Sequence, residues 1–170
     1  DTQFSADLTI MEEGNEFLER LKGNGKLPMI TSCSSAWMKC LEQFHPDLID
    51  NVSTCKSPMS MMSALVKTYF AEKIKVDPKN ILSVAIMCCT AKKYEAARPE
   101  LQVNGMPATD MVITTREMAW MIKSFGIDFL HIKGEQFDEP LGLSSGAGAI
   151  FGATGGVMEA AVRSAYALVT

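Results

Sequence analysis

Long apolar stretches and an excess of basic residues are both missing from this sequence. No apolar run approaches the ~18 residues that a membrane-spanning helix needs, so we expect no membrane partner. The 170 residues include 16 Lys and Arg against 20 Asp and Glu, a net charge of −4, which leaves no basic footprint for nucleic acid. Neither a signal peptide nor an initiator Met stands at Asp1. We therefore expect a cytoplasmic protein of which this chain is a fragment.

Metal-ligating residues are few and irregularly spaced. The two histidines, His45 and His131, have no partner at ligand spacing, and we assign both to structure. The five cysteines are an odd number, Cys88 and Cys89 are adjacent, and no C-x-x-C pair occurs. Without a secretory signal, this pattern favours reduced thiols for metal or redox work over a disulfide framework. A thiol–disulfide enzyme is disfavoured, because two adjacent cysteines close only a strained ring.

Hydrophobic periodicity predicts a layered α/β domain. Stripes at helical spacing predict helices over 8–21, 37–44, 58–74, 91–97, 115–125 and 155–168, and apolar runs predict strands over 27–32, 81–87 and 110–114. Ser57 and Thr115 are expected to cap the helices that follow them. The run over 81–87 is nearly continuous, as in strands buried on both faces of a parallel sheet. Alternating strands and helices predict a parallel sheet flanked by helices in a single domain, 1–170.

Cysteines follow two of the predicted strands at their ends. Cys33 comes after the first strand, and Cys88 and Cys89 come after the second. Because ligands of open parallel sheets bind beyond the carboxyl ends of strands, the two sites plausibly converge on one pocket. The alternative is that each cysteine is a small buried hydrophobe. Lys92 and Lys93 at the following helix start suit an anionic ligand, or are simply exposed charges.

A glycine-rich loop over 142–156 has the composition of a phosphate-binding loop but not the sequence motif of one. It lacks the Gly-Lys-Ser/Thr ending of a P-loop, and Gly146, Gly148 and Gly152 miss the dinucleotide spacing by one residue. Close packing of the backbone, against protein or near a cofactor, is the better interpretation.

Motifs spread over nearly the whole chain resemble the catalytic domain of [FeFe]-hydrogenases. The matching segments are, in order, 6–14, 28–33 with Trp37, 55–58, 87–96, 113–117 and 145–160. Several long motifs in the right order make the resemblance specific. It implies that this α/β chain is one of two lobes holding the family's H-cluster, a four-iron cubane joined by a cysteine sulfur to a di-iron unit with CO and cyanide ligands.

The family's first motif is T-S-C-C-P, in which the first cysteine passes protons to the di-iron unit and the second holds the cubane. By this resemblance Cys33 is the proton relay. Ser34 stands where the cubane ligand is expected, and Ser35 replaces the proline.

The second motif is M-P-C-x-x-K. Cys89 matches its cubane ligand, Met87 its methionine and Lys92 the lysine that hydrogen-bonds a cyanide, whereas Cys88 replaces the proline. The third motif, which carries two more cysteines including the bridging one, is expected beyond Thr170.

The family's proton path runs from the relay cysteine through two glutamates and a serine, and Glu16, Ser53 and Glu13 match these positions. Taken alone, the acidic face of the first helix looks solvated; the resemblance implies instead that Glu13 and Glu16 point inward. Phe151 and the adjoining glycines resemble the family's cofactor-packing segment.

The resemblance implies that the parent protein is an oxidoreductase that interconverts H2 with protons and electrons. Its partners are then the remainder of the hydrogenase chain and a ferredoxin or an NAD(P)H-linked protein. A cubane needs four thiolates, and this chain matches only one, Cys89, so we expect the fragment alone to lack the H-cluster. The alternative is a non-catalytic relative in iron–sulfur cluster assembly or sensing, in which Ser34 marks lost cubane binding.

Overall fold

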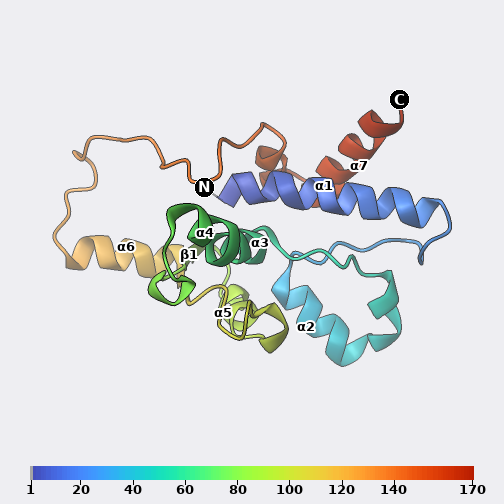
Figure 1. Cartoon of the computed structure of the whole chain (residues 1–170), viewed down its shortest axis with the longest axis horizontal. Helices are drawn as coiled ribbons and strands as arrows, with labels where there is room; N and C mark the ends of the chain where they lie inside the picture. Colours follow the sequence, from blue (N-terminus) through green and yellow to red (C-terminus); the bar gives the residue numbers. More distant parts are fainter. Residues whose placement is uncertain (1) are drawn as a thin grey trace. The chain divides into compact units, whose positions relative to one another are not determined.

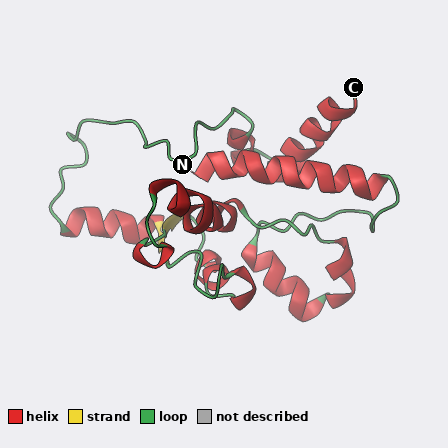
Figure 2. Cartoon of the chain, viewed as in Figure 1, coloured by secondary structure: helices red, strands yellow, loops and turns green. Residues whose placement is uncertain are grey.

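The computed structural model describes residues 2–170, which form two compact units. Of these residues, unit 1 comprises 2–62 and Leu141–Thr170, and unit 2 comprises Ser63–Pro140. Helices dominate both units, and strands are short (Figure 2). No helix among these residues is long and apolar enough to cross a membrane.

Two helices from opposite ends of the sequence form the core of unit 1. Helix α1 (Thr2–Leu21) lies beside α7 (Gly156–Val169) (Figure 1). Small residues line their contact: a Cβ atom on Gly14 would lie 3.5 Å from the carbonyl oxygen of Ala161. This close approach lets α1 bury one complete face, including Ile10, which is 1% exposed.

The segment predicted as the first strand makes only one bridge. Ile30 pairs in parallel with Val52, through hydrogen bonds from Ile30 to the Asn51 carbonyl (2.8 Å) and from Ser53 to the Ile30 carbonyl (2.7 Å). Beyond this pair the Ser32 hydroxyl donates to the Cys55 carbonyl at 2.6 Å. The prediction of a strand over 27–32 is therefore wrong, because the Cys55 N–H, which a longer parallel ladder would direct to the Ser32 carbonyl, donates to the Ser53 hydroxyl at 3.2 Å instead.

Unit 1 also contains α2 (Ser35–Phe44), the 3₁₀ helix η1 (Pro46–Asn51) and the 3₁₀ helix η5 (Gly148–Gly152). The carboxylate of Asp7 accepts hydrogen bonds from the backbone of Ser145 and, at 2.8 Å, of Gly148. A Cβ atom on Gly148 would lie 2.9 Å from the Gln3 carbonyl oxygen. The glycine-rich loop thus cradles a carboxylate of its own chain, and its glycine permits a close approach to α1.

The chain passes from unit 1 into unit 2 through α3 (Pro58–Leu65), a π-helical turn η2 (Val66–Phe70) and α4 (Ala71–Ile74). The predicted cap at the start is confirmed, since the Ser57 hydroxyl accepts from the backbone of Ser60 at 3.4 Å. The π-helical turn carries Lys67, whose 3%-exposed side chain pairs with Asp110 at 2.8 Å and donates to the Pro78 and Ile81 carbonyls. This buried ion pair ties the turn to the segments that precede both strands of the unit.

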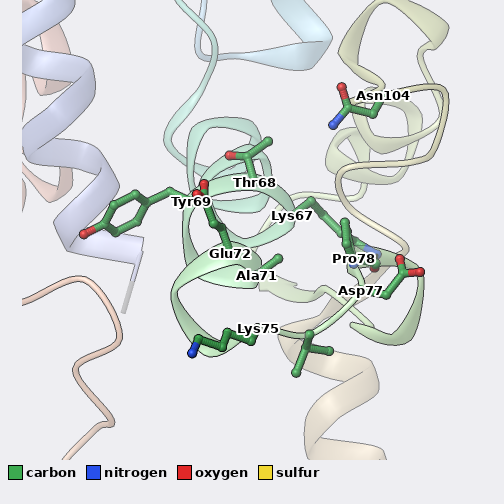
Figure 3. A pocket seen from close by; sticks show the side chains of 10 residues that line it. Lys67, Thr68, Tyr69, Ala71, Glu72, Lys75, Asp77, Pro78 and Asn104 are labelled. Atoms are coloured by element: carbon green, nitrogen blue, oxygen red, sulfur yellow. Dashed lines mark hydrogen bonds between the residues drawn. The ribbon is translucent and has the colours of Figure 1, made fainter.

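An open pocket of about 720 Å³ lies over this turn, between Lys67, Tyr69, Glu72, Lys75 and Asp77 (Figure 3). Its lining mixes both signs of charge, and Lys67 is already fully engaged with its own chain. We assign it no function.

The sheet of unit 2 has two parallel strands, β1 (Val84–Met87) and β2 (Met111–Thr114), with Val84 opposite Met111 and Met87 opposite Thr114. The parallel sheet is confirmed, but burial of 81–87 on both faces is wrong. Val84 is 42% and Ile86 51% exposed, because within residues 63–140 no second layer covers that face.

Short helices complete unit 2: η3 (Pro78–Asn80), α5 (Ala91–Ala96), η4 (Pro99–Leu101) and α6 (Thr115–Ser124). The cap of α6 is Thr114 and not Thr115 as predicted. The Thr114 hydroxyl accepts from the Glu117 backbone at 3.2 Å, and the Glu117 carboxylate accepts from the Thr114 backbone at 2.8 Å. This reciprocal capping box sets the start of the helix one residue earlier.

Candidate active site

Two glutamates on the inner face of α1 form the centre of the candidate site. Glu13 and Glu16 are three residues apart, a spacing that places both side chains on one side of a helix. The Glu13 side chain is 0% exposed and that of Glu16 is 17% exposed. The helix therefore carries one carboxylate fully into unit 1 and leaves the next one closer to solvent.

Glu16 is surrounded by hydrogen-bond donors. Its Oε2 accepts from the hydroxyl of Ser53 (3.2 Å) and from the backbone N–H and hydroxyl of Thr54 (3.0 Å each). Its Oε1 accepts from Nη2 (2.6 Å) and Nε (3.0 Å) of Arg20. Burial by itself raises the pKa of Glu16, but the bonds from Arg20 and Thr54 outweigh it, so the pKa lies below its ordinary value. Glu16 is ionised at neutral pH.

Glu13 is in the opposite situation. Neither of its carboxylate oxygens has a partner in full hydrogen-bond geometry among residues 2–170. Burial raises its pKa, the nearby Ser53 hydroxyl and Ser32 backbone offset part of the rise, and the charge of Glu16 adds to it. Ser53 is thus near both carboxylates, and Glu13 is the one that holds a proton more readily.

Arg20 is a site residue that the sequence patterns did not single out. It is 7% exposed, and besides Glu16 it binds the carbonyl oxygens of Lys26, Asp50, Asn51 and Val52 at 2.7–3.2 Å. Its place four residues after Glu16 on a predicted helix was the available signal. Arg20 fixes both the outer carboxylate and the segment that carries Ser53.

Cys33 and Ser34 lie between the Ile30–Val52 bridge and α2. Cys33 is half-buried, and Ser34 is exposed. Ser34 is the N-cap of α2, and its hydroxyl accepts a hydrogen bond from the Trp37 backbone at 3.4 Å. The Ser34 side chain, at the position where the family is expected to have a cubane ligand, therefore caps the N-terminus of α2.

In unit 2, β1 ends at Met87, and Cys88 and Cys89 follow it as exposed thiols. Lys92, in the first turn of α5, pairs with Glu95 at 2.6 Å, with only 14% and 8% of the two side chains exposed. Lys93 pairs with Glu117 at 2.5 Å. Both lysine charges are thus offset by carboxylates of the same unit.

The remaining predicted residues are placed as follows. Phe151 is half-buried in η5 of unit 1. His45 is exposed at the end of α2, and exposed His131 contacts Asp128 at 2.8 Å. The shared pocket for Cys33 and the Cys88–Cys89 pair remains a prediction.

The residues of this chain do not fit a complete cubane. Among residues 2–170, no group of three or more His, Cys, Asp or Glu side chains could hold a metal ion. Four thiolates are needed, and a hydroxyl such as that of Ser34 holds its proton too tightly and is too hard a ligand to replace one. Any complete cluster needs ligands from outside this sequence.

Relatives of this chain are known hydrogenases. It is 53% identical to the NADP-reducing hydrogenase subunit HndD of Solidesulfovibrio fructosivorans and 54% identical to the periplasmic [Fe] hydrogenase large subunit of Nitratidesulfovibrio vulgaris, in each case over 100% of this chain. These matches cover 30% and 41% of the two relatives. The chain therefore spans less than half of their length.

A solved structure shares the fold. Apo [FeFe]-hydrogenase HydA1 from Chlamydomonas reinhardtii matches with a TM-score of 0.87 and 48% identity, over 98% of this chain and 42% of that one. A more distant relative, the cytosolic Fe–S cluster assembly factor narfl of Xenopus tropicalis, is 32% identical over 97% of this chain and 37% of its own length.

The family model for the C-terminal domain of the iron-only hydrogenase large subunit matches residues 1–170. With the shared fold and the hydrogenase relatives at about half identity, this match means that the chain belongs to the iron-only hydrogenase large-subunit family.

Proposed function

We propose that the parent protein is an [FeFe]-hydrogenase that interconverts H2 with protons and electrons, and that residues 1–170 are part of one catalytic domain. The observation that carries the proposal is the pair of the buried Glu13 and the partly exposed Glu16, with Ser53 near both carboxylates. An unpartnered, fully buried carboxylate costs stability, and a path that moves protons to a buried site gives it a use.

The proposed path uses Cys33, Glu13, Ser53 and Glu16. Glu16 is its outer member, because it is partly exposed and anchored by Arg20. Glu13 is its inner member, and Ser53 passes a proton between the two carboxylates by rotating its hydroxyl. Cys33 is the relay thiol beyond Glu13.

The proposed cofactor is the H-cluster, which supplies the redox chemistry when bound. Cys89 is proposed as one cubane ligand, Lys92 as a hydrogen-bond donor to a cyanide ligand, and Met87 and Phe151 as packing residues. The buried pairing of Lys92 with Glu95 supports this role for the lysine, since a fixed ammonium is a better directional donor than a mobile one.

The proposed partners are the remainder of the hydrogenase chain and a ferredoxin or NAD(P)-linked electron carrier. The name of one relative, an NADP-reducing subunit, supports the second option. We propose a cytoplasmic location, supported by the five cysteines, none of which forms a disulfide among residues 2–170. Fractionation of the source cells, with antibody detection in cytoplasm and periplasm, tests this location.

A second candidate is a non-catalytic role in iron–sulfur cluster assembly. Ser34 favours it, because the side chain at a cubane position caps α2, and assembly factors are among the more distant relatives. The hydrogenase proposal has the stronger support, since the buried glutamate pair has no evident use in a protein that moves no protons to a buried site.

The deciding experiment treats the full-length parent with a synthetic di-iron cofactor after iron–sulfur reconstitution, and measures bound iron and H2 evolution together. Stoichiometric iron with turnover supports the hydrogenase. Bound iron without any H2 chemistry supports the assembly role. The 170-residue chain treated in the same way is the control, and we expect neither bound cluster nor H2 from it.

A further inference from the structure

Thr54 makes an unusually complete contact with Glu16. Both its backbone N–H and its hydroxyl reach Glu16 Oε2, at 3.0 Å each, and the N–H is also 3.3 Å from Oε1. The residue lies between Ser53 and Cys55, whose hydroxyl and thiol also donate to Oε2, so one short segment delivers four donors to one carboxylate oxygen. Arg20 occupies the other oxygen with two N–H groups.

Ser53 alone cannot hold Glu16 and serve Glu13 at once, because a serine hydroxyl has one proton to donate. In this structure it donates to Glu16 at 3.2 Å, and Glu13 is left without a full hydrogen bond. When Ser53 turns toward Glu13, Glu16 loses that donor. The hydroxyl and N–H of Thr54, at 3.0 Å each, are then the shortest hydrogen bonds that keep Oε2 in place, beside the longer one from the Cys55 thiol at 3.8 Å.

We propose that Thr54 is a positioning residue of the proton path: with Arg20 it holds Glu16 ionised and keeps Oε2 beside Ser53 while the serine hydroxyl turns. The proposal rests on the proposed proton path for its functional consequence. Its structural part, the control of Glu16 by the Thr54 hydroxyl, stands on the contacts of unit 1 alone.

The other charged and titratable groups around Glu16 are few. Arg20 is its cation and Glu13 is the neighbouring carboxylate. The thiol of Cys55 lies 3.8 Å from Oε2 of Glu16. Burial raises the pKa of this thiol to about 11, so it stays neutral over the acidic pH range in which Glu16 titrates. Removing the Thr54 hydroxyl therefore changes one interaction with the charged form of Glu16 and leaves the surrounding charges as they are.

The first test is the titration of Glu16 in the 170-residue chain, followed by the ¹³C resonance of its side-chain carboxyl. We expect Thr54→Val to raise the titration midpoint of Glu16 by about half to one pH unit, a threefold to tenfold gain in proton affinity, because a charge-assisted hydrogen bond is lost. Thr54→Ser keeps the hydroxyl and is expected to titrate like the original protein. Thr68→Val, which removes a hydroxyl bonded only to the Ala64 carbonyl at 2.7 Å, is the matched control.

Thr54 is exposed, so we expect its variants to fold, and Thr54→Ala provides a second hydroxyl-free variant. An unchanged Glu16 midpoint in both hydroxyl-free variants overturns the proposal. A rise in Thr54→Ser as large as in Thr54→Val also overturns it, since the hydroxyl is then not the cause.

The second test measures the pH–rate profile of H2 evolution in the cofactor-loaded parent. We expect the acidic limb of the profile to move in Thr54→Val in the same direction as the Glu16 midpoint, and to return in Thr54→Ser. A shifted Glu16 midpoint with an unshifted rate profile contradicts the proposed path through Glu16, while the contact between Thr54 and Glu16 stands.

Discussion

Glu13 and Glu16 lie one helical turn apart on α1, and their pKa values are displaced in opposite directions. Burial raises the pKa of Glu13, whereas hydrogen bonds from Arg20 and Thr54 lower that of Glu16 in spite of its burial. Two identical side chains in one helix therefore have different protonation preferences, which their surroundings set. Because Ser53 lies near both carboxylates, its hydroxyl can provide a route for a proton between Glu13 and Glu16.

The Glu13 carboxylate is expected to cost stability at neutral pH. Its raised pKa means that the folded state prefers the protonated form, so stability is present below the ordinary pKa and falls as the pH rises through the folded value. Glu13→Gln removes the buried charge and should raise the free energy of unfolding at pH 7 by about 1 kcal/mol. Urea unfolding at pH 4 and pH 8 checks this. A gain that is equal at both pH values would contradict the assignment.

Glu16 is expected to show the opposite pH dependence. Its folded pKa is depressed, so its contribution to stability is present above the ordinary pKa and is lost as the pH falls through the folded value. Glu16→Gln should therefore destabilise the protein at pH 7 more than at pH 3. Thermal unfolding across this range is the measurement, with Glu159→Gln on an exposed ion pair as control.

Arg20 should be among the least replaceable polar residues of unit 1. Arg20→Ala leaves Glu16 without its cation and removes one hydrogen-bond donor from each of four backbone carbonyl oxygens. We expect a loss of about 3 kcal/mol in the free energy of unfolding. The exposed Arg163, also paired with a glutamate four residues away, should lose less than ~0.5 kcal/mol when changed to Ala. Similar losses in the two variants would show that the buried contacts of Arg20 contribute little.

Ser34→Cys tests the cubane position in the full-length parent. A thiolate there restores the cubane ligand of the family's first motif, so we expect higher iron occupancy, seen by Mössbauer or EPR spectroscopy. The same change removes the Ser34 cap of α2, which should lower stability by about 1 kcal/mol in the 170-residue chain. Equal cluster content in both forms of the parent would mean that another group, such as Cys88, already provides the cubane ligand that is missing at Ser34.

Cys33→Ala separates a relay from a ligand. As a relay, Cys33 is needed for turnover but not for iron, so the cofactor-loaded variant should lose H2 evolution and keep its cluster spectra. Cys33→Asp retains a titratable group of similar reach and should keep part of the rate. Iron content is measured beside the rate in both variants, and loss of iron in Cys33→Ala would overturn the relay assignment.

The sequence by itself determined the helices with clear periodicity and caps, and the family. Ser57 before Pro58, and the apolar stripe ending near Gly23 and Gly25, depend on local backbone chemistry that neighbouring residues specify. The length of the strands could not be predicted from the sequence, because a strand extends only as far as a neighbouring strand pairs with it. Ile30 pairs once, with Val52, and the Cys55 N–H that a longer ladder needs donates to the Ser53 hydroxyl instead.

Only the tertiary structure decided the chemistry of the candidate site. The sequence pattern of an acidic helix face does not tell whether that face is exposed to water or packed against protein. Glu13 lies fully inside because α1 is packed into unit 1. The pKa of Glu16 is lowered by Arg20 and by Thr54, which belongs to a segment 37 residues or more away in sequence. Arg20 binds that same segment. Burial and hydrogen bonding between distant residues set proton affinity, so these assignments required the fold.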